Sequence, residues 1–219
     1  RNQAVIGASF RYNHGWFDAF GEIATAQNHQ ITNDQSPITK SHWGFGTIIG
    51  SRFYPTNGFS LLALYRYYSP YFDNALGYAF SETSRLGDEN GGYLGFDITR
   101  LRNWRFIGYG DIFYFSGYKY GLGDATRTLG YDAMAEIQYS WSKHPSFQGG
   151  DGGRLSLRLR ARQKGDATYS TRAQFDWVQG SWSLRTTAEA NIIPSKLSTL
   201  NSQLTYGYTI FQDISYSLP

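Results

Sequence analysis

Four arginines alternate with apolar residues in the stretch 154–162, which reads RLSLRLRAR. Successive side chains of a β-strand point to opposite faces, so a strand here would carry guanidinium groups on one face and aliphatic groups on the other. A helix would scatter Leu155, Leu157 and Leu159 around its axis, which favours the strand. Such a guanidinium row can bind the phosphates of a nucleic acid, form ion pairs on a water-soluble sheet, or line a water-filled lumen in a membrane protein.

The neighbouring segments argue against a nucleic-acid function. Asp132 and Glu136 precede the arginine row and Asp176 follows it, so acids interleave with the guanidinium groups. The formal net charge is only +3, from 20 Lys and Arg against 17 Asp and Glu, whereas nucleic-acid binders present one clustered basic face. We therefore expect no nucleic-acid partner. In a lumen, a basic strip beside acids could order water and select solutes, or its ion pairs could rigidify a narrow barrel that conducts nothing.

Nucleophiles and metal ligands show no catalytic pattern. The chain has no cysteine, which excludes a disulfide framework and a thiolate metal site. The histidines lie in links or at strand ends without metal-ligand spacing; they are His14, His29, His42 and His144. His144 lies near Ser140 and Ser142, but in a loop with no third group to orient it. We expect no enzyme activity, no cofactor and no metal.

Alternating polar and apolar residues recur along nearly the whole chain, and no helical stripe persists. Aromatic residues make up 18% and there are 25 glycines, a mixture that suits strands and turns. No stretch approaches the roughly 18 consecutive apolar residues of a membrane-spanning helix. We predict one all-β domain, residues 1–219, of antiparallel strands. The predicted strands are 4–12, 15–26, 42–54, 59–68, 92–101, 104–115, 130–141, 154–163, 169–178, 181–192 and 203–217.

The predicted links alternate in length. The short ones are 13–14, 55–58, 102–103 and 179–180, and the long ones are 27–41, 69–91, 116–129 and 193–202. Short turns at one end and long loops at the other are typical of an up-and-down barrel in an outer membrane. The link 142–153 is longer than this scheme requires. The charged link 69–91 could fold inward as a constriction, dock on a partner, or remain a solvated loop; its charges are Asp73, Glu82, Arg85, Asp88 and Glu89.

One face of nearly every predicted strand lacks charge. In 169–178, for example, Arg172 and Asp176 oppose Phe175 and Trp177. Arginines and acids share the other face in nearly equal numbers, and burying that many unpaired charges in a protein core would be costly. We expect the following side chains to line a lumen: Arg158, Arg160, Arg162, Arg172, Asp176, Arg185, Glu189, Asp132, Glu136, Arg105, Asp111, Arg66, Asp18 and Glu22.

The tryptophans distinguish a membrane sheet from a soluble one. Each lies within a residue or two of a predicted strand end; they are Trp16, Trp43, Trp104, Trp141, Trp177 and Trp182. Indole rings settle at the membrane–water interface and form girdles, whereas a soluble core would draw them toward strand centres. We therefore predict an antiparallel up-and-down transmembrane β-barrel, with about 11–12 strands in this chain. A soluble β-barrel or sandwich is the alternative.

A set of short signatures lies within residues 61–115, and others flank it. They are 65–70 (YRYYSP), 79–82 (AFSE), Asn90 with 92–95 (GYLG), Trp104 and 111–115 (DIFYF), with 20–24 upstream and 131–139 and 160–163 downstream. In these signatures the chain resembles the outer-membrane β-barrel portion of Bacteroidota proteins commonly labelled helix-hairpin-helix domain-containing. The resemblance implies a bacterial outer-membrane location, with membrane lipid and lipopolysaccharide around the barrel.

The chain departs from that pattern in two places. The hairpin-helix segments that name the family are absent, so no DNA binding is carried over. The last residues read ISYSLP rather than ending on an aromatic residue, and the predicted strand number is odd where such barrels have an even one. We therefore expect the 219 residues to be an incomplete part of a larger barrel.

Two functions remain open at this point. The first is a porin-like channel or conduit for small polar solutes, lined by the charged residues named above. The second is a structural or assembly subunit of an outer-membrane complex, with a plugged, non-conducting lumen, that contacts other outer-membrane proteins through its long loops. The number of strands in the complete barrel separates them, since small barrels are filled by their own side chains.

Overall fold

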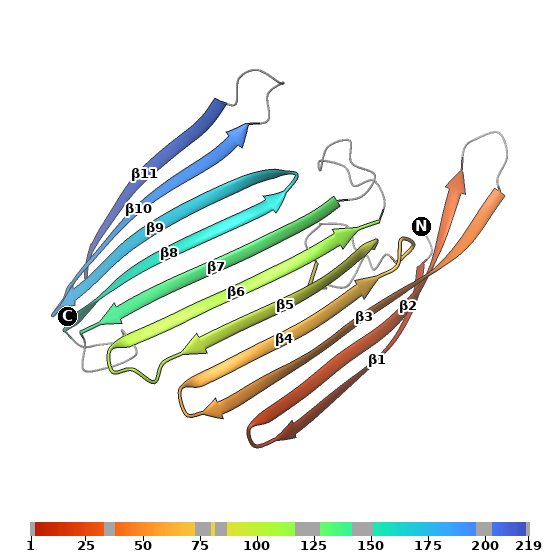
Figure 1. Cartoon of the computed structure of the whole chain (residues 1–219), viewed down its shortest axis with the longest axis horizontal. Helices are drawn as coiled ribbons and strands as arrows, with labels where there is room; N and C mark the ends of the chain where they lie inside the picture. Colours follow the sequence, from red (N-terminus) through yellow and green to blue (C-terminus); the bar gives the residue numbers. More distant parts are fainter. Residues whose placement is uncertain are drawn as a thin grey trace. The chain divides into compact units, whose positions relative to one another are not determined.

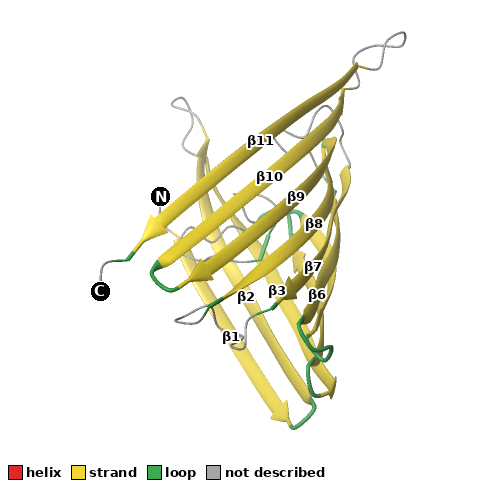
Figure 2. Ribbon diagram, turned by 90° about the vertical axis from the view of Figure 1, so that its left-hand side faces the viewer, coloured by secondary structure: helices red, strands yellow, loops and turns green. Residues whose placement is uncertain are grey.

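The structure is a computed structural model that describes residues 3–32, 38–72, 80–81, 87–116, 128–141, 151–195 and 203–217. Within these ranges it contains β-strands and loops but no helix (Figure 2). The strands are β1 (Gln3–His14), β2 (Phe17–Thr32), β3 (Ile38–Thr56), β4 (Phe59–Tyr68), β5 (Glu89–Ile98), β6 (Trp104–Phe115), β7 (Thr128–Ser140), β8 (Gly152–Lys164), β9 (Asp166–Gln179), β10 (Trp182–Ser195) and β11 (Gln203–Tyr216). In the described part of the chain, no helix is long and apolar enough to span a bilayer.

The strands form one 11-stranded sheet in which each strand pairs with the next along the chain (Figure 1). The all-β, antiparallel, up-and-down fold predicted from the sequence is therefore confirmed. Among the described residues no pairing joins β11 to β1, so the sheet is not closed. Strand direction alternates, and an odd number of strands leaves β1 and β11 running in the same direction.

Every predicted strand overlaps one strand of the structure. The strand predicted at 92–101 is shifted to Glu89–Ile98, because Glu-Asn-Gly-Gly resembles a turn but is extended. The link predicted at 27–41 is also shorter. β2 continues to Thr32 and pairs with β3 down to Ile38, forming a long hairpin whose polar sequence hides the alternation.

The predicted alternation of link lengths is wrong around β8. A single residue, Gly165, joins β8 to β9, at the strand end where the scheme places long loops. Its φ of +88° is a left-handed conformation that glycine adopts without steric cost. Residues 141–151 join β7 to β8 at the opposite end, in agreement with the long link predicted at 142–153, which departs from the alternation.

The residues group into two compact units. Unit 1 contains Arg1–Phe53, Leu62–Leu94 and Asp111–Gly130, and unit 2 contains Tyr54–Leu61, Gly95–Gly110 and Tyr131–Pro219. Among the described residues, the buried aromatic side chains all belong to unit 1; they are Tyr68, Phe72, Phe113 and Phe115. In unit 2 the buried side chains are carboxylates instead, namely Asp132, Glu136 and Asp176. The prediction of a single domain remains a prediction.

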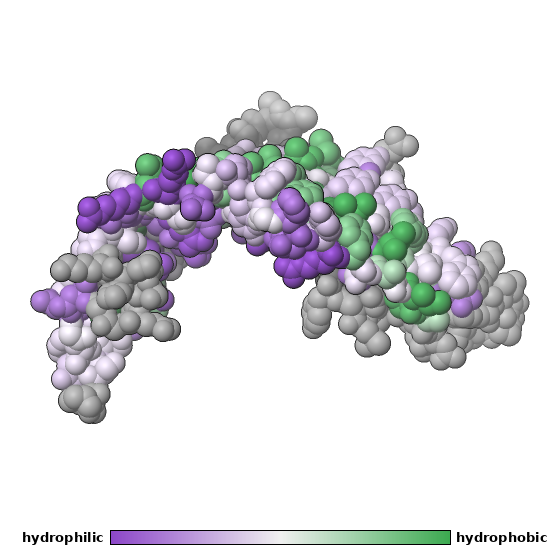
Figure 3. Space-filling model, turned by 90° about the horizontal axis from the view of Figure 1, so that it is seen from below, coloured by the Kyte–Doolittle hydropathy of each residue, from purple (hydrophilic) through white to green (hydrophobic). Residues whose placement is uncertain are grey.

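On β7 and β8 the charged face is more buried than the aliphatic face. On β8 the aliphatic side chains are exposed, with Leu155 at 50%, Leu157 at 45% and Leu159 at 52%, while Asp132 and Glu136 of the neighbouring strand retain 4% and 6%. The space-filling view likewise shows separate hydrophobic and hydrophilic patches (Figure 3). We call the side that carries the charges the polar face and the other the apolar face. A water-soluble sheet buries its aliphatic residues and exposes its charges, which is the reverse arrangement.

Candidate functional site

The candidate site is the polar face of unit 2, where strands β7 to β10 bring arginines and acids together. Arg158 of β8 stands opposite Glu136 of β7, and its Nε donates to Glu136 Oε2 at 2.6 Å. Arg172 of β9 stands opposite Glu189 of β10, and its Nη2 donates to Glu189 Oε2 at 2.6 Å. Arg158 and Arg172 are also opposite each other. The four residues thus form a straight row across four strands, which we call the acid–arginine row.

Asp132 is a further acid on this face that binds arginines. Arg160 Nε donates to Asp132 Oδ1 at 2.8 Å, although Arg160 stands opposite Met134, so the ion pair runs diagonally. Arg162 stands opposite Asp132, and its Nε lies 3.6 Å from Asp132 Oδ2. Tyr109 of β6 donates its hydroxyl to the same carboxylate at 3.2 Å. Asp132 is therefore held from both neighbouring strands.

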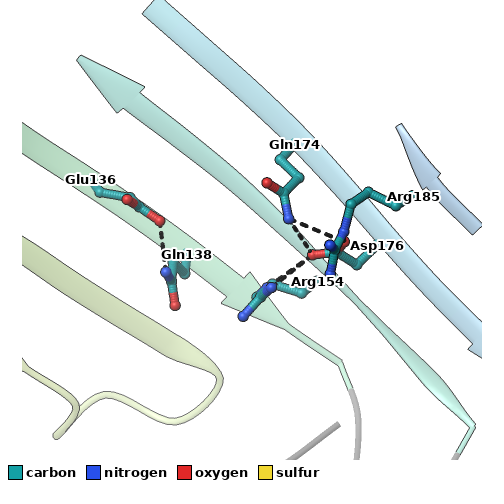
Figure 4. A network of polar contacts seen from close by, with 6 residues as sticks. All are labelled: Glu136, Gln138, Arg154, Gln174, Asp176 and Arg185. Carbon is teal, nitrogen blue, oxygen red and sulfur yellow. Dashed lines mark hydrogen bonds and ion pairs between the residues drawn. The ribbon is translucent and has the colours of Figure 1, made fainter. Parts of the chain in front are cut away.

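Asp176 likewise binds two arginines (Figure 4). Its Oδ2 accepts from Arg154 Nη2 at 2.8 Å, and its Oδ1 accepts from Arg185 Nε at 2.6 Å. Gln174, two residues earlier on the same strand, donates to Asp176 Oδ2 at 2.8 Å. One carboxylate thus binds two guanidinium groups and balances the charge of one of them. Arg105 and Asp97 form a further ion pair at 2.5 Å, but both are substantially exposed, where a pair contributes little stability.

The acids lie deep and the arginines lie above them. The side chains of Asp132, Glu136 and Asp176 are 5 to 7% exposed, whereas the arginines that contact them are 33 to 55% exposed. These acids bind the guanidinium groups, and the arginine side chains remain more exposed to solvent than the acids. Around Asp132, Glu136 and Asp176 the polar face therefore exposes more of the arginines than of the acids.

Unit 1 contains a separate ion cluster that is closed to solvent, which we call the Arg66 cluster. Arg66 Nε lies 2.5 Å from Glu89 Oε1 and Arg66 Nη1 lies 2.8 Å from Asp111 Oδ1, and no side chain of the three is more than 2% exposed. The ring of Phe80 lies 4.9 Å from Arg66 Cζ, and Ser81 donates to Glu89 Oε2 at 2.7 Å. Arg66 and Asp111 are thus on the polar face, as predicted, but they are covered.

The covering residues come from the long connection after β4. Phe72 lies against β3 so closely that a Cβ added at Gly44 would be 2.3 Å from Phe72 Cα. Its ring stacks on Tyr68 at 5.6 Å, and the Tyr68 hydroxyl donates to the carbonyl of Phe80 at 3.1 Å. We call residues 69–72 and 80–81 the inward segment. These residues lie over the polar face of unit 1. Whether the link 69–91 constricts a lumen stays a prediction, and Asp73, Glu82 and Arg85 lie outside the described residues.

The remaining lumen predictions, Asp18 and Glu22, are on β2. Asp18 is 8% exposed, stands opposite Arg52 and accepts a hydrogen bond from Asn13. Glu22 is exposed and stands opposite Ser9 and Ile48. Both are on the polar face of β2. The structure does not bring them into the acid–arginine row or the Arg66 cluster.

The sequence prediction missed two residues that hold these sites. Glu89 was assigned to a loop, although the period-two series from Glu89 to Asp97 would have placed it on the polar face of β5. Tyr109 gave no signal, because a tyrosine between glycines in WRFIGYGDIFYF suits either face. Among the described residues, no group of three or more His, Cys, Asp or Glu side chains could hold a metal ion.

The tryptophans concentrate at one end of the strands. Trp104 begins β6, Trp182 begins β10, Trp141 follows β7, Trp177 lies two residues before the end of β9, and Trp16 lies in the turn after β1. Trp43 is the exception, because β3 begins at Ile38 and places it five residues inside the strand. The five other than Trp16, which lies in a turn, are on the apolar face by parity with their charged neighbours, and all six but Trp177 are exposed.

The rings contact one another across neighbouring strands of unit 2. Trp104 lies 4.8 Å from Tyr139, and Trp182 lies 4.8 Å from Tyr216. At the other end of these strands the apolar face carries tyrosines instead, among them Tyr131 of β7 and Tyr169 of β9. Each end of the unit 2 strands thus carries aromatic residues with a polar tip. No protein-family model, curated protein or solved structure matches the chain significantly.

Proposed function

We propose that this chain forms part of the wall of a bacterial outer-membrane β-barrel that acts as a porin-like conduit for small polar solutes. The observation that carries the proposal is the inverted burial of the sheet: exposed leucines on the apolar face and buried carboxylates on the polar face. Hydrocarbon outside and water inside stabilise this arrangement, since a transmembrane barrel strand alternates lipid-facing apolar and lumen-facing polar residues.

The spacing of the aromatic residues supports the same conclusion. Tyr131 and Trp141 mark the two ends of the apolar face of β7, and the positions between them carry Ala133, Ala135, Ile137 and Tyr139. Ten residues of strand extend about 33 Å, which at a tilt of about 40° corresponds to about 25 Å along the barrel axis. The apolar band of an outer-membrane barrel is about 25 Å tall.

The open edges support a barrel completed by further strands. A bilayer core offers no water to the backbone groups of β1 and β11, so a spanning sheet must close. Since β1 and β11 run in the same direction, antiparallel closure needs an odd number of additional strands. One addition to the 11-stranded sheet gives twelve, above the roughly eight strands whose lumen side chains fill completely and below the about sixteen of the wide porins.

The resemblance to the Bacteroidota barrels fits this proposal, and it supplies the outer-membrane location. The partners are then membrane lipid and lipopolysaccharide on the apolar face. Other outer-membrane proteins would contact the long loops. The polar-face arginines of β8, β9 and β10 would line the route of the solute.

One observation favours the second function, a plugged structural or assembly subunit. The inward segment covers the Arg66 cluster on the polar face of unit 1, so this part of the face does not contact solvent. In a complete barrel the segment would narrow the lumen. A constriction leaves a conduit for small solutes, whereas complete occlusion would leave a structural role.

Conductance separates the two functions. The complete barrel protein would be inserted into planar bilayers, with insertion established independently by its resistance to extraction from vesicles at high pH. Stepwise current increases of uniform size are expected for the conduit. Inserted protein without current would reject the conduit and leave the plugged subunit, and failure to insert would reject both.

A further inference from the structure

The acid–arginine row places two guanidinium groups side by side at its centre. Glu136, Arg158, Arg172 and Glu189 are in register across β7, β8, β9 and β10, which lie next to one another (Figure 1). Each arginine is bound by the acid on its outer side, so no acid of the described residues stands between Arg158 and Arg172. Directly opposite like charges on adjacent strands destabilise a sheet, unless an anion lies between them.

Both arginines retain donors at this position. Within the part of the chain that the structure describes, Arg158 donates only through Nε, and Arg172 donates through Nε and Nη2. A guanidinium has five N–H donors in a planar fork that matches the oxygens of a carboxylate or phosphate. The side chains are 40% and 42% exposed, so a solute can reach these donors.

The surroundings add positive charge and hydroxyl groups but no acid between the arginines. Arg160 follows Arg158 on the same face and stands opposite Ser170, and Arg162 stands opposite Thr168. In this part of unit 2, Arg160 and Arg162 share Asp132, and Arg154 and Arg185 share Asp176. Asp213 of β11 also stands opposite Arg185, so these four arginines face three acids on the described strands.

We propose that Arg158 and Arg172 together bind one oxyanion group, a carboxylate, phosphate or sulfate, on the solute that the conduit carries. The assignment rests on the proposed function for its role in passage, because the solute must travel along the polar face to reach the two arginines. Small solutes that carry such an oxyanion group are therefore the preferred class.

The test uses inorganic phosphate as the probe, with the protein in planar bilayers. Phosphate added to a chloride electrolyte is expected to reduce the current in a saturable way, and reversal potentials are expected to show preference for anions. Arg158→Gln and Arg172→Gln should each require about tenfold more phosphate for half-maximal block, the effect of losing one charge-assisted contact of about 1.4 kcal/mol. Arg105→Gln removes the same charge from the same face away from the row and should leave the block unchanged.

A second variant controls for misfolding. It is needed because Arg158→Gln leaves Glu136 without its ion-pair partner. The double variant Glu136→Gln/Arg158→Gln removes both charges, and it should fold and still lose phosphate block. Arg158→Lys should keep anion preference but weaken the block, since an ammonium cannot bind an oxyanion through a planar fork. Block that is equal in the row variants and in Arg105→Gln, or preference for cations, would overturn the assignment.

Failure of the conduit and failure of the binding site give different results. If inserted protein is silent, phosphate binding is measured by ³¹P line broadening on the detergent-solubilised protein. Broadening that disappears in Arg158→Gln but persists in Arg105→Gln supports the site while rejecting the conduit. Current without phosphate block rejects the site while supporting the conduit, and broadening unaffected by Arg158→Gln also rejects the site.

Discussion

The guanidinium group of Arg66 lies directly over the backbone of Gly91, and a Cβ added at Gly91 would be 2.7 Å from Arg66 Cζ. Arg66 is fully buried and bound to Glu89 and Asp111, so it cannot move aside without breaking an ion pair. The hydrogen on Gly91 in place of a methyl group is therefore what lets the Arg66 cluster form. Glycine is needed here for space and not for an unusual backbone angle.

Gly91→Ala is expected to lower the free energy of unfolding by about 3 kcal/mol or more, because displacing one member of a buried ion pair leaves the others uncompensated. Gly92→Ala is the matched control. Gly92 is the next residue, on the opposite face, and an added Cβ there would have nothing within 4 Å. Denaturant titration of both variants in lipid vesicles measures the difference. Equal stability would show that Arg66 is not fixed by its partners.

The alternation of polar and apolar residues in the sequence predicts the faces of the strands but not the pairing between them. Alternation assigns each residue to a face, and this was enough to place every strand and the charged face of β8. It does not reveal which residues stand opposite each other, because register depends on link lengths. The row from Glu136 to Glu189 follows from pairings that a one-residue slip would destroy.

The cover of the Arg66 cluster could not be predicted from the alternation either. Its cover comes from Phe80 and Ser81, which belong to a connection and not to a strand, so no periodicity marks them. Phe72 against Gly44 is likewise a contact between a loop and a strand distant in sequence. Contacts of this kind depend on the path of the loop, which the residue pattern does not specify.

A charge placed on the apolar face tests whether that face contacts lipid. Leu157, near the middle of β8, is 45% exposed, so Leu157→Arg would cost little in water. In a bilayer the same change is expected to lower the free energy of unfolding by about 2 to 4 kcal/mol, as for an arginine at the midplane. Ser156→Arg is the control, because Ser156 is on the polar face opposite Gln138 and Gln174. The two variants are compared by unfolding in vesicles; a harmless Leu157→Arg would argue for a water-soluble sheet.

Tryptophan fluorescence tests the position of the aromatic residues independently of stability. Trp104, Trp141 and Trp182 lie at the ends of their strands on the apolar face, so their rings should reside near the lipid headgroups. Lipids brominated near the headgroup end of the acyl chain should therefore quench the fluorescence more than lipids brominated near its methyl end. The measurement uses vesicles that contain the protein and one brominated lipid at a time. Stronger quenching from the methyl end, or none from either lipid, would contradict a girdle.

The inward segment provides a test of what limits passage. Phe72 is 4% exposed, packs on Tyr68 and lies over Gly44 and Gly46, so Phe72→Ala should release the segment from the polar face of β3. The expected cost is about 3 to 5 kcal/mol of unfolding free energy, as for other buried phenylalanines, together with a larger single-channel current. Tyr71→Ala is the neighbouring control, because Tyr71 is 54% exposed and contacts the ring of His42 instead. A folded Phe72→Ala variant with the current of the unsubstituted protein would mean that the segment lies outside the route of the solute, and its contacts would then serve only to stabilise unit 1.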